Sequence, residues 1–151
     1  MLISDRDLLL QWWTPMPTAR RSGLPYIKHI DDGLTILKNL TTDVLILQAY
    51  TLHPIIQSDV DYVEGSKFLV EAGVHPIVLM LLGEYRKTAN AYLPRDPPRL
   101  PAISPDRRVN LMLYVDKIQN MSDVCQYNKD IKDLPHYLEY FTNWLKALGT
   151  P

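Results

Sequence analysis

Apolar residues recur along the chain at three- and four-residue steps, which is the spacing of one face of an α-helix. Residues 27–40 show the pattern clearly, with Ile27, Ile30, Leu34 and Leu37 on a common face. The same spacing predicts further helices over residues 4–13, 43–53, 74–93, 105–125 and 134–148. No segment alternates apolar and polar positions convincingly enough to predict a strand. The sequence therefore predicts an all-α protein.

Residues that cap or stop helices stand at the ends of these segments. Ser4 or Asp5 can cap the first helix and Asp43 the third, while Gly149 follows the last. The chain has 12 prolines and six glycines, and the prolines concentrate at residues 14–17 and 94–105. Because proline ends helices, both clusters are expected to be connections. The longer one carries several arginines, so a lid over a site is the alternative to a plain connection.

Length and composition fit a single compact domain over residues 1–151. With 46% hydrophobic residues, the chain is long enough to pack roughly five to seven helices around one core. Sixteen basic and 17 acidic residues give a formal charge of −1, so neither nucleic acid nor a membrane is expected as a partner. A single cysteine, without a leader or a long apolar run, predicts a cytoplasmic location.

Three polar residues interrupt apolar stretches of separate predicted helices. His29 lies on the apolar face of residues 27–40, His53 ends the next helix, and Asp116 stands within NLMLYVDKIQNM. A single histidine on such a face is usually a hydrogen-bonded core residue. Imidazole and carboxylate groups that converge from different helices are also what a divalent metal site requires. The three together therefore indicate either a polar core cluster or a metal centre.

Two motifs resemble those of a known family. RRSGLPYIKH at residues 20–29 resembles the opening motif of the alarmone hydrolase domain in the Rel/Spo branch of the HD superfamily. VDKIQNM at residues 115–121 resembles the later Asp-Arg-Leu-His-Asn-Met segment of that branch. The likeness covers about residues 5–125 and keeps the motifs in order. It implies an HD-domain-like, all-helical fold that hydrolyses phosphate esters with a divalent metal.

The resemblance also implies roles for individual residues. Three residues match its metal-ligand positions, with Mn2+ as the expected ion: His29, His53 and Asp116. Arg20 would lie beside or over a purine base, with Arg21 next to it, since a guanidinium stacks on a flat aromatic face. Asn120 would hydrogen-bond the ribose or the base. The implied ligand is a purine nucleotide or alarmone.

The chain departs from this family at the carboxylates. Pro54 stands where the aspartate of the family's His-Asp pair is expected, and Gln57 and Ser58 align with a Glu-Asp pair that positions water. Three carboxylates are thereby replaced by neutral side chains. Loss of a metal ligand or of its partner commonly lowers affinity or activity by about 10-fold to 100-fold. The resemblance thus implies a pocket whose metal chemistry is altered.

Other residues offer replacements for the lost groups. Asp59, Asp61 or Glu84 could supply a carboxylate or act in catalysis, although Asp59 and Asp61 also fit a solvated loop whose aspartate caps the next helix. The stretch EYRKTANAY places Arg86 and Asn90 where they could contact phosphate or base. A surface pair of Glu84 and Arg86 is the alternative.

Two functions from different classes follow. In the first, the protein is a divergent HD phosphohydrolase that acts on a purine nucleotide or alarmone through metal-activated water. In the second, the hydrolase has lapsed and the fold binds a nucleotide or a protein partner. The first requires Asp59, Asp61 or Glu84 at the metal, and the second predicts Pro54 packed against a site that lacks a replacement. Assembly into a homo-oligomer stays open.

Overall fold

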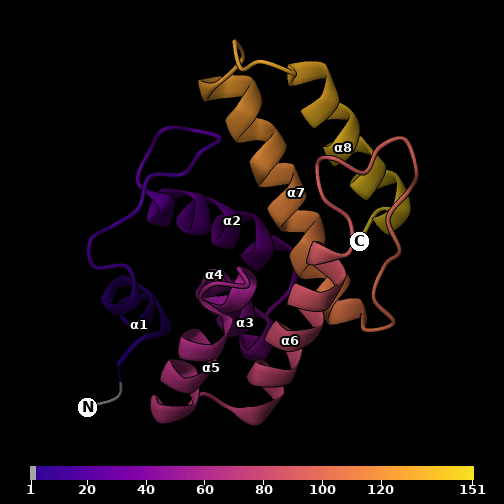
Figure 1. The fold of residues 1–151 in the computed structure, drawn as a ribbon. Coiled ribbons are helices and arrows are strands. Elements are labelled where there is room, and N and C mark those ends of the chain that lie inside the picture. The colour runs from indigo at the N-terminus through magenta and orange to yellow at the C-terminus, as the bar shows by residue number, and fades with distance from the viewer. Residues whose placement is uncertain (1–2) are drawn as a thin grey trace.

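The computed structural model describes residues 3–151, and within them the chain forms eight α-helices and no strand. The helices are α1 (Asp5–Trp12), α2 (Tyr26–Leu40), α3 (Val44–Leu52), α4 (Pro54–Gln57), α5 (Tyr62–Glu71), α6 (Pro76–Asn90), α7 (Arg107–Tyr127) and α8 (Leu134–Leu148). Figure 1 shows them gathered into one compact body. The prediction of an all-α protein is confirmed. None of these helices is long and apolar enough to cross a membrane.

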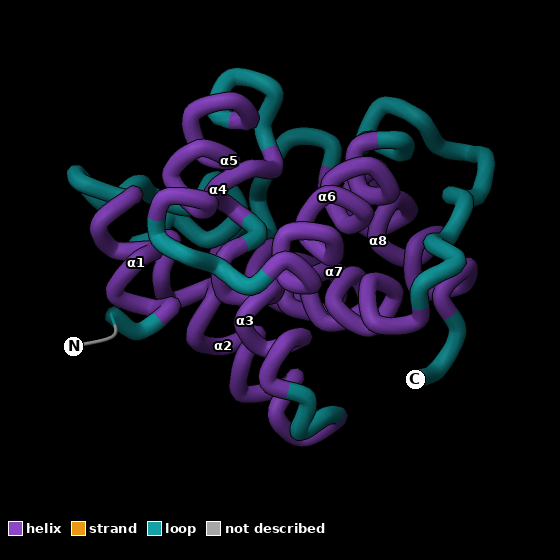
Figure 2. Tube along the Cα trace, turned by 90° about the horizontal axis from the view of Figure 1, so that it is seen from below, coloured by secondary structure: helices purple, strands orange, loops and turns teal. Residues whose placement is uncertain are grey.

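The long helix α7 lies at the centre of the fold. It packs against α2, α3, α6 and α8, and α8 runs alongside it in Figures 1 and 2. Apolar side chains from all these helices are fully buried: Ile30, Leu37, Leu52, Tyr85, Met112, Leu113, Phe141 and Trp144. Helix α7 also carries buried polar side chains: Asp116, Lys117, Gln119, Asn120 and Asp123. Polar groups therefore enter the core along one helix, and the candidate site is built around it.

Side chains cap the helices where the sequence predicts their ends. The Ser4 and Asp43 side chains accept hydrogen bonds from the backbone amides of Asp7 and Leu45, at the starts of α1 and α3. The cap of α1 is thus Ser4 and not Asp5. Gly149 follows α8 with a φ of 72°, the left-handed conformation that glycine adopts without strain.

The structure has more helices than the roughly five to seven predicted for a core of this size. The two additional helices, α4 and α5, lie between His53 and the helix predicted over residues 74–93. Proline is favoured at the first position of a helix, and Pro54 opens the one-turn helix α4 directly after α3. Residues 58–65, which contain Asp59 and Asp61 and could have formed a loop, include the start of α5 at Tyr62. Asp61 occupies the N-cap position of α5, but its side chain makes no capping hydrogen bond and instead accepts one from the Ser58 hydroxyl at 2.9 Å. The prediction of a capping aspartate is therefore wrong.

Gly65 allows α5 to lie against α4. A Cβ at this buried position would come 2.4 Å from the carbonyl oxygen of Ile55, which is backbone and cannot rotate away. We expect Gly65→Ala to lower the free energy of unfolding by about 1–3 kcal/mol, as overpacking does. Gly83→Ala on α6 is the matched control, since its Cβ would meet no atom within 4 Å. Urea unfolding followed by circular dichroism measures both variants, and equal stabilities would contradict the contact.

Candidate functional site

Three polar side chains from separate helices meet in the core. His29 lies on α2, His53 lies between α3 and α4, and Asp116 lies in the middle of α7. Nε2 of His29 is 3.0 Å from Oδ1 of Asp116, and Nε2 of His53 is 3.8 Å from the same oxygen. All three side chains are at most 5% exposed. We call these three residues the histidine–aspartate cluster.

The other ring nitrogen of each histidine has an acceptor of its own. Nδ1 of His29 is 3.2 Å from Oδ2 of Asp123, and Nδ1 of His53 is 2.5 Å from the backbone carbonyl of Tyr50. These contacts turn both Nε2 atoms towards Asp116, which is the orientation of metal-ligating histidines. Asp123 was missed by sequence reasoning. Its signal is its place two helical turns after Asp116, on the same face of α7.

The second carboxylate oxygen of Asp116, Oδ2, accepts hydrogen bonds from an ammonium group and an amide group. Nζ of Lys117 is 3.1 Å from Oδ2, and Nδ2 of Asn120 donates to the same oxygen at 3.0 Å. The Lys117 ammonium also lies 5.8 Å from the ring centroid of Tyr140 and 5.5 Å from that of Trp144. Cation–π attraction adds to the ion pair at this buried position. Both carboxylate oxygens of Asp116 therefore interact with protein groups.

Burial and neighbouring charges shift the pKa values of the cluster in opposite directions. Burial opposes the charged form of His29, but hydrogen bonds to Asp116 and Asp123 outweigh it and raise the pKa of His29 to about 9. Burial lowers the pKa of His53 to about 4, so this ring is neutral at neutral pH. Burial also disfavours the Asp116 anion, yet Lys117 and His29 hold the pKa of Asp116 well below its usual value. A buried carboxylate thus lies among an imidazolium, an imidazole and an ammonium.

The donors of the cluster match the expected metal site in type and orientation but not in number. Pro54 follows His53, and across residues 3–151 no group of three or more His, Cys, Asp or Glu side chains has the arrangement of a metal site. The Asp116 carboxylate already has cationic partners in His29 and Lys117, which a dication would have to displace. The residues present therefore do not fit the Mn2+ centre that the resemblance implies.

The three candidate replacement carboxylates have partners outside the cluster. The Asp59 side chain is 92% exposed and pairs with Arg86, and Asp61 accepts a hydrogen bond from a neighbouring serine. Glu84 accepts a hydrogen bond from the Ser104 hydroxyl at 2.9 Å, so it does not form the alternative pair with Arg86. None of these three carboxylates therefore stands in for the aspartate that the resemblance implies at position 54.

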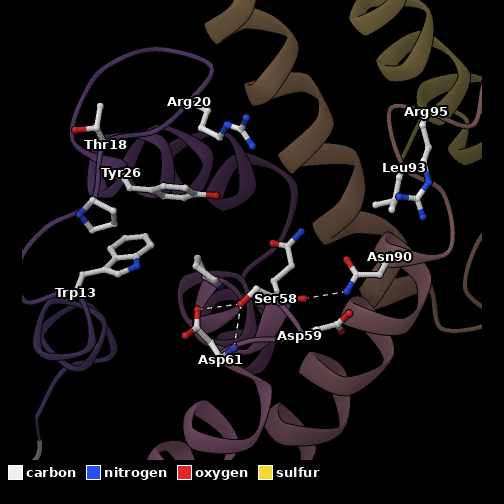
Figure 3. A pocket seen from close by; sticks show the side chains of 13 residues that line it. Trp13, Thr18, Arg20, Tyr26, Ser58, Asp59, Asp61, Asn90, Leu93 and Arg95 are labelled. Carbon is white, nitrogen blue, oxygen red and sulfur yellow. Dashed lines mark hydrogen bonds between the residues drawn. The ribbon is translucent and has the colours of Figure 1, made fainter.

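A wide cavity of about 720 Å³ lies at the surface beside the cluster, and we call it the outer cavity. Figure 3 shows two facing sets of side chains around it: Trp13, Arg20 and Tyr26 on one side, and Asn90 and Arg95 on the other. Residues of the segment 54–61 also line it, Pro54 among them. The Tyr26 ring meets the His29 ring edge-on, with centroids 5.6 Å apart. Tyr26 therefore stands between the outer cavity and the buried cluster.

A smaller cavity of about 110 Å³, the inner cavity, reaches Asp116. Four residues line both cavities: Tyr26, Gln57, Asn90 and Leu93. The charged residues that line the inner cavity are Arg21, Asp116 and Lys117. The shared residues make the two cavities neighbours.

Most residues expected to contact a nucleotide line these cavities. Four of the five do so: Arg20, Arg21, Asn90 and Asn120. Arg86 differs, because its Nε donates to the Ile56 carbonyl at 2.9 Å and its guanidinium lies 4.3 Å from the centroid of the Tyr62 ring. Together with its ion pair to Asp59, these contacts hold the segment after α4 in place. Arg86 therefore shapes the outer cavity without lining it.

The start of the proline-rich segment forms part of the outer cavity. Leu93 and Arg95 line it, and the carbonyl of Pro94 accepts a hydrogen bond from Nε2 of His136 on α8. These contacts fix the start of the segment beside the cavity, while its role as a lid stays a prediction.

A scan of the chain against protein-family models finds no match, and searches of the curated proteins and of the solved structures find no similar protein. Function has to be inferred from the residues and the geometry of the site. The features that bear on function are the motif residues in the cluster and the residues that line the two cavities.

The Asp123 carboxylate is expected to keep His29 charged at neutral pH. NMR titration of the metal-free protein should give a His29 pKa of about 9, and Asp123→Asn should lower it because an anionic partner is lost. A raised pKa in the folded state stabilises the fold below pH 6.5, and this contribution disappears as the pH rises through 9. At pH 6 the substitution should therefore lower the free energy of unfolding by about 1.5–3 kcal/mol.

Asp130→Asn is the control for this prediction, because Asp130 is exposed in the loop after α7. It should leave both the His29 pKa and the stability unchanged. A His29 pKa that is the same in Asp123→Asn and in the wild type would contradict the pairing.

Proposed function

We propose that the chain has an HD-like fold and binds a phosphorylated purine nucleotide without hydrolysing it. The observation that carries the proposal is the pair of adjoining cavities next to the histidine–aspartate cluster. Their linings combine cationic, aromatic and amide side chains, which suit a nucleotide, with the carboxylates of Asp59, Asp61 and Asp116. The positions of three carboxylates of the HD hydrolases are instead neutral: Pro54, Gln57 and Ser58.

The packing of two distant motifs supports the HD resemblance. The motifs at residues 20–29 and 115–121 lie on or beside α2 and α7, which pack against each other. His29 from the first motif and Asp116 from the second are 3.0 Å apart. Two motifs that serve one ligand site have to meet in this way.

The outer cavity suits a flat purine base. The rings of Trp13 and Tyr26 lie 4.7 Å apart between centroids and offer aromatic surface for stacking. Arg20 is exposed at the same cavity, and its guanidinium can stack on a base. Nδ2 of Asn90 donates to the Gln57 carbonyl at 2.9 Å, which leaves its amide oxygen as an acceptor for the ligand. The outer cavity therefore offers both stacking and hydrogen bonding.

The histidine–aspartate cluster offers no strong base that could activate water. Asp116 interacts through both oxygens with side chains of the protein. His29 has a carboxylate at each ring nitrogen, and Nδ1 of His53 is held by the Tyr50 carbonyl. Nε2 of His53 has no hydrogen-bond partner among the described residues, but burial lowers the pKa of this ring to about 4, which makes it a weak base at neutral pH. Binding without turnover follows from this arrangement.

A metal-dependent phosphohydrolase is the second candidate function. The orientation of His29 and His53 favours it, because both Nε2 atoms face one oxygen of Asp116. Two histidines and one carboxylate form a ligand set that is known for catalytic metals. Purine nucleotides or alarmones would then be substrates and not only ligands.

Nucleotide binding should depend on Arg20. Titration calorimetry with ATP, GTP, their deoxy forms and guanosine tetraphosphate is expected to show saturable binding of at least one of them. Arg20→Ala should weaken this binding by about 10-fold, because a stacking guanidinium is lost. Arg107→Ala is the matched control, since Arg107 is exposed on α7 and lines neither cavity. Failure of the wild type to bind any of these nucleotides would overturn the proposal.

The same nucleotides with added Mn2+ distinguish the two candidates. Wild type and Asp116→Asn are both expected to release no phosphate or pyrophosphate above background. If the wild type turns over one nucleotide and Asp116→Asn does not, the protein is a hydrolase and the non-hydrolytic proposal is wrong.

A further inference from the structure

The inner cavity is lined by charged side chains, which suit a phosphate group better than a purine base. Two of its lining side chains, Arg21 and Lys117, are cationic, and Asp116 is the carboxylate beside them. We infer that this cavity is a phosphate subsite in which Lys117 and Arg21 hold the terminal phosphate group of the ligand. The inference rests on the proposed function, and it names the part of the nucleotide that approaches the cluster.

Lys117 keeps donor capacity for a ligand although it is buried. Its side chain is 4% exposed, and an ammonium at such a position is costly unless its donors are satisfied. An ammonium has three N–H donors, and Oδ2 of Asp116 is the acceptor that the protein provides for them. The rings of Tyr140 and Trp144 attract the charge but accept no conventional hydrogen bond. Phosphate oxygens would satisfy the remaining donors.

Arg21 brings a second cation with an unused donor. Its Nε is buried and has no hydrogen-bond partner in the described part of the chain. Its guanidinium lies 5.4 Å from the centroid of the Phe141 ring, so the side chain is packed in place at the edge of the cavity. A guanidinium presents five N–H donors in a fixed geometry that matches phosphate oxygens. An oxyanion in the cavity would supply the missing partner.

Charge and size restrict the group that can enter the inner cavity. Arg21 and Lys117 are opposed by Asp116, so the charged residues in the lining sum to +1. A volume of about 110 Å³ is enough for several waters or for one phosphate group, whereas a purine base fits the outer cavity. Asn90 and Gln57 line the boundary between the two cavities, where ribose or further phosphates would lie. The geometry therefore favours an orientation in which the base lies in the outer cavity and the terminal phosphate lies in the inner cavity.

The subsite also accounts for a nucleotide that is bound without being hydrolysed. A dication and an ammonium both neutralise a carboxylate and attract phosphate oxygens. A dication additionally lowers the pKa of bound water and so generates a nucleophile, which an ammonium does not do. Lys117 next to Asp116 thus attracts phosphate oxygens but does not activate water for hydrolysis.

The experiment compares ligands that carry phosphate with ligands that lack it. Titration calorimetry is carried out with pyrophosphate, with GTP and ATP, and with guanosine and adenosine. Lys117→Met and Arg21→Gln are each expected to weaken pyrophosphate and nucleotide binding by about 10-fold to 100-fold, because a charge-assisted interaction is lost. Nucleoside binding is expected to stay unchanged, since the base remains in the outer cavity.

Two further variants control for folding and for charge. Lys117→Met leaves the buried Asp116 without its ammonium partner, so the double variant Asp116→Asn/Lys117→Met removes both charges together. Lys129→Met removes a charge from an exposed position after α7 and should bind like the wild type. Circular dichroism verifies the fold of each protein. Arg21→Gln tests the same subsite from a half-buried position if the Lys117 variants do not fold.

The outcomes separate this inference from the proposed function. Nucleotide binding that is unchanged in Arg21→Gln and in the folded Lys117 variants would overturn the phosphate subsite and leave nucleotide binding intact. Equal wild-type affinities for nucleotide and nucleoside would do the same. Pyrophosphate binding that depends on Lys117, without binding of any nucleotide, would support the subsite and overturn the proposed function. Absence of binding by every probe would overturn both.

Discussion

The buried carboxylate of Asp116 is the constraint on which the rest of the structure depends. An ionised carboxylate in the core is costly unless charges and hydrogen bonds compensate for it. Compensation comes from α2 through His29 and from α7 itself through Lys117 and Asn120. Because these groups belong to different helices, satisfying one carboxylate fixes how α2 and α7 pack. The interior packing and the candidate site are therefore one arrangement.

The same arrangement supports the proposal of nucleotide binding without hydrolysis. Imidazolium and ammonium groups lie next to Asp116, where the HD hydrolases have a divalent ion, and Pro54 removes a further carboxylate from the neighbourhood. In the proposed function, this charge balance attracts phosphate oxygens, while Asp116 and His29 are engaged with protein groups and are not available to activate water. A separate contact holds the segment after His53, since Nε of Arg86 on α6 donates a hydrogen bond to the Ile56 carbonyl.

Much of the fold could be predicted because helix periodicity and capping are local properties. The helices around Ile30 and Leu52 follow from apolar spacing, and Ser4 and Asp43 cap where short polar side chains precede an apolar run. Helix α5 was missed because its position is decided by packing, as the close approach of Gly65 to α4 shows. Asp123 was missed for a related reason: its value comes from a histidine 94 residues away in the sequence.

The sequence by itself determined the helical class, the main helix ends, and the residue types that stand at His29, His53 and Asp116. These features depend on spacing and on side-chain chemistry, which a linear chain displays directly. Only the tertiary structure decided that Nε2 of both histidines faces one oxygen of Asp116, that Lys117 is buried beside them, and that two cavities adjoin the cluster. The physical reason is that hydrogen bonds, ion pairs and cavities are properties of distance in space, and helices distant in the sequence determine that distance when they pack.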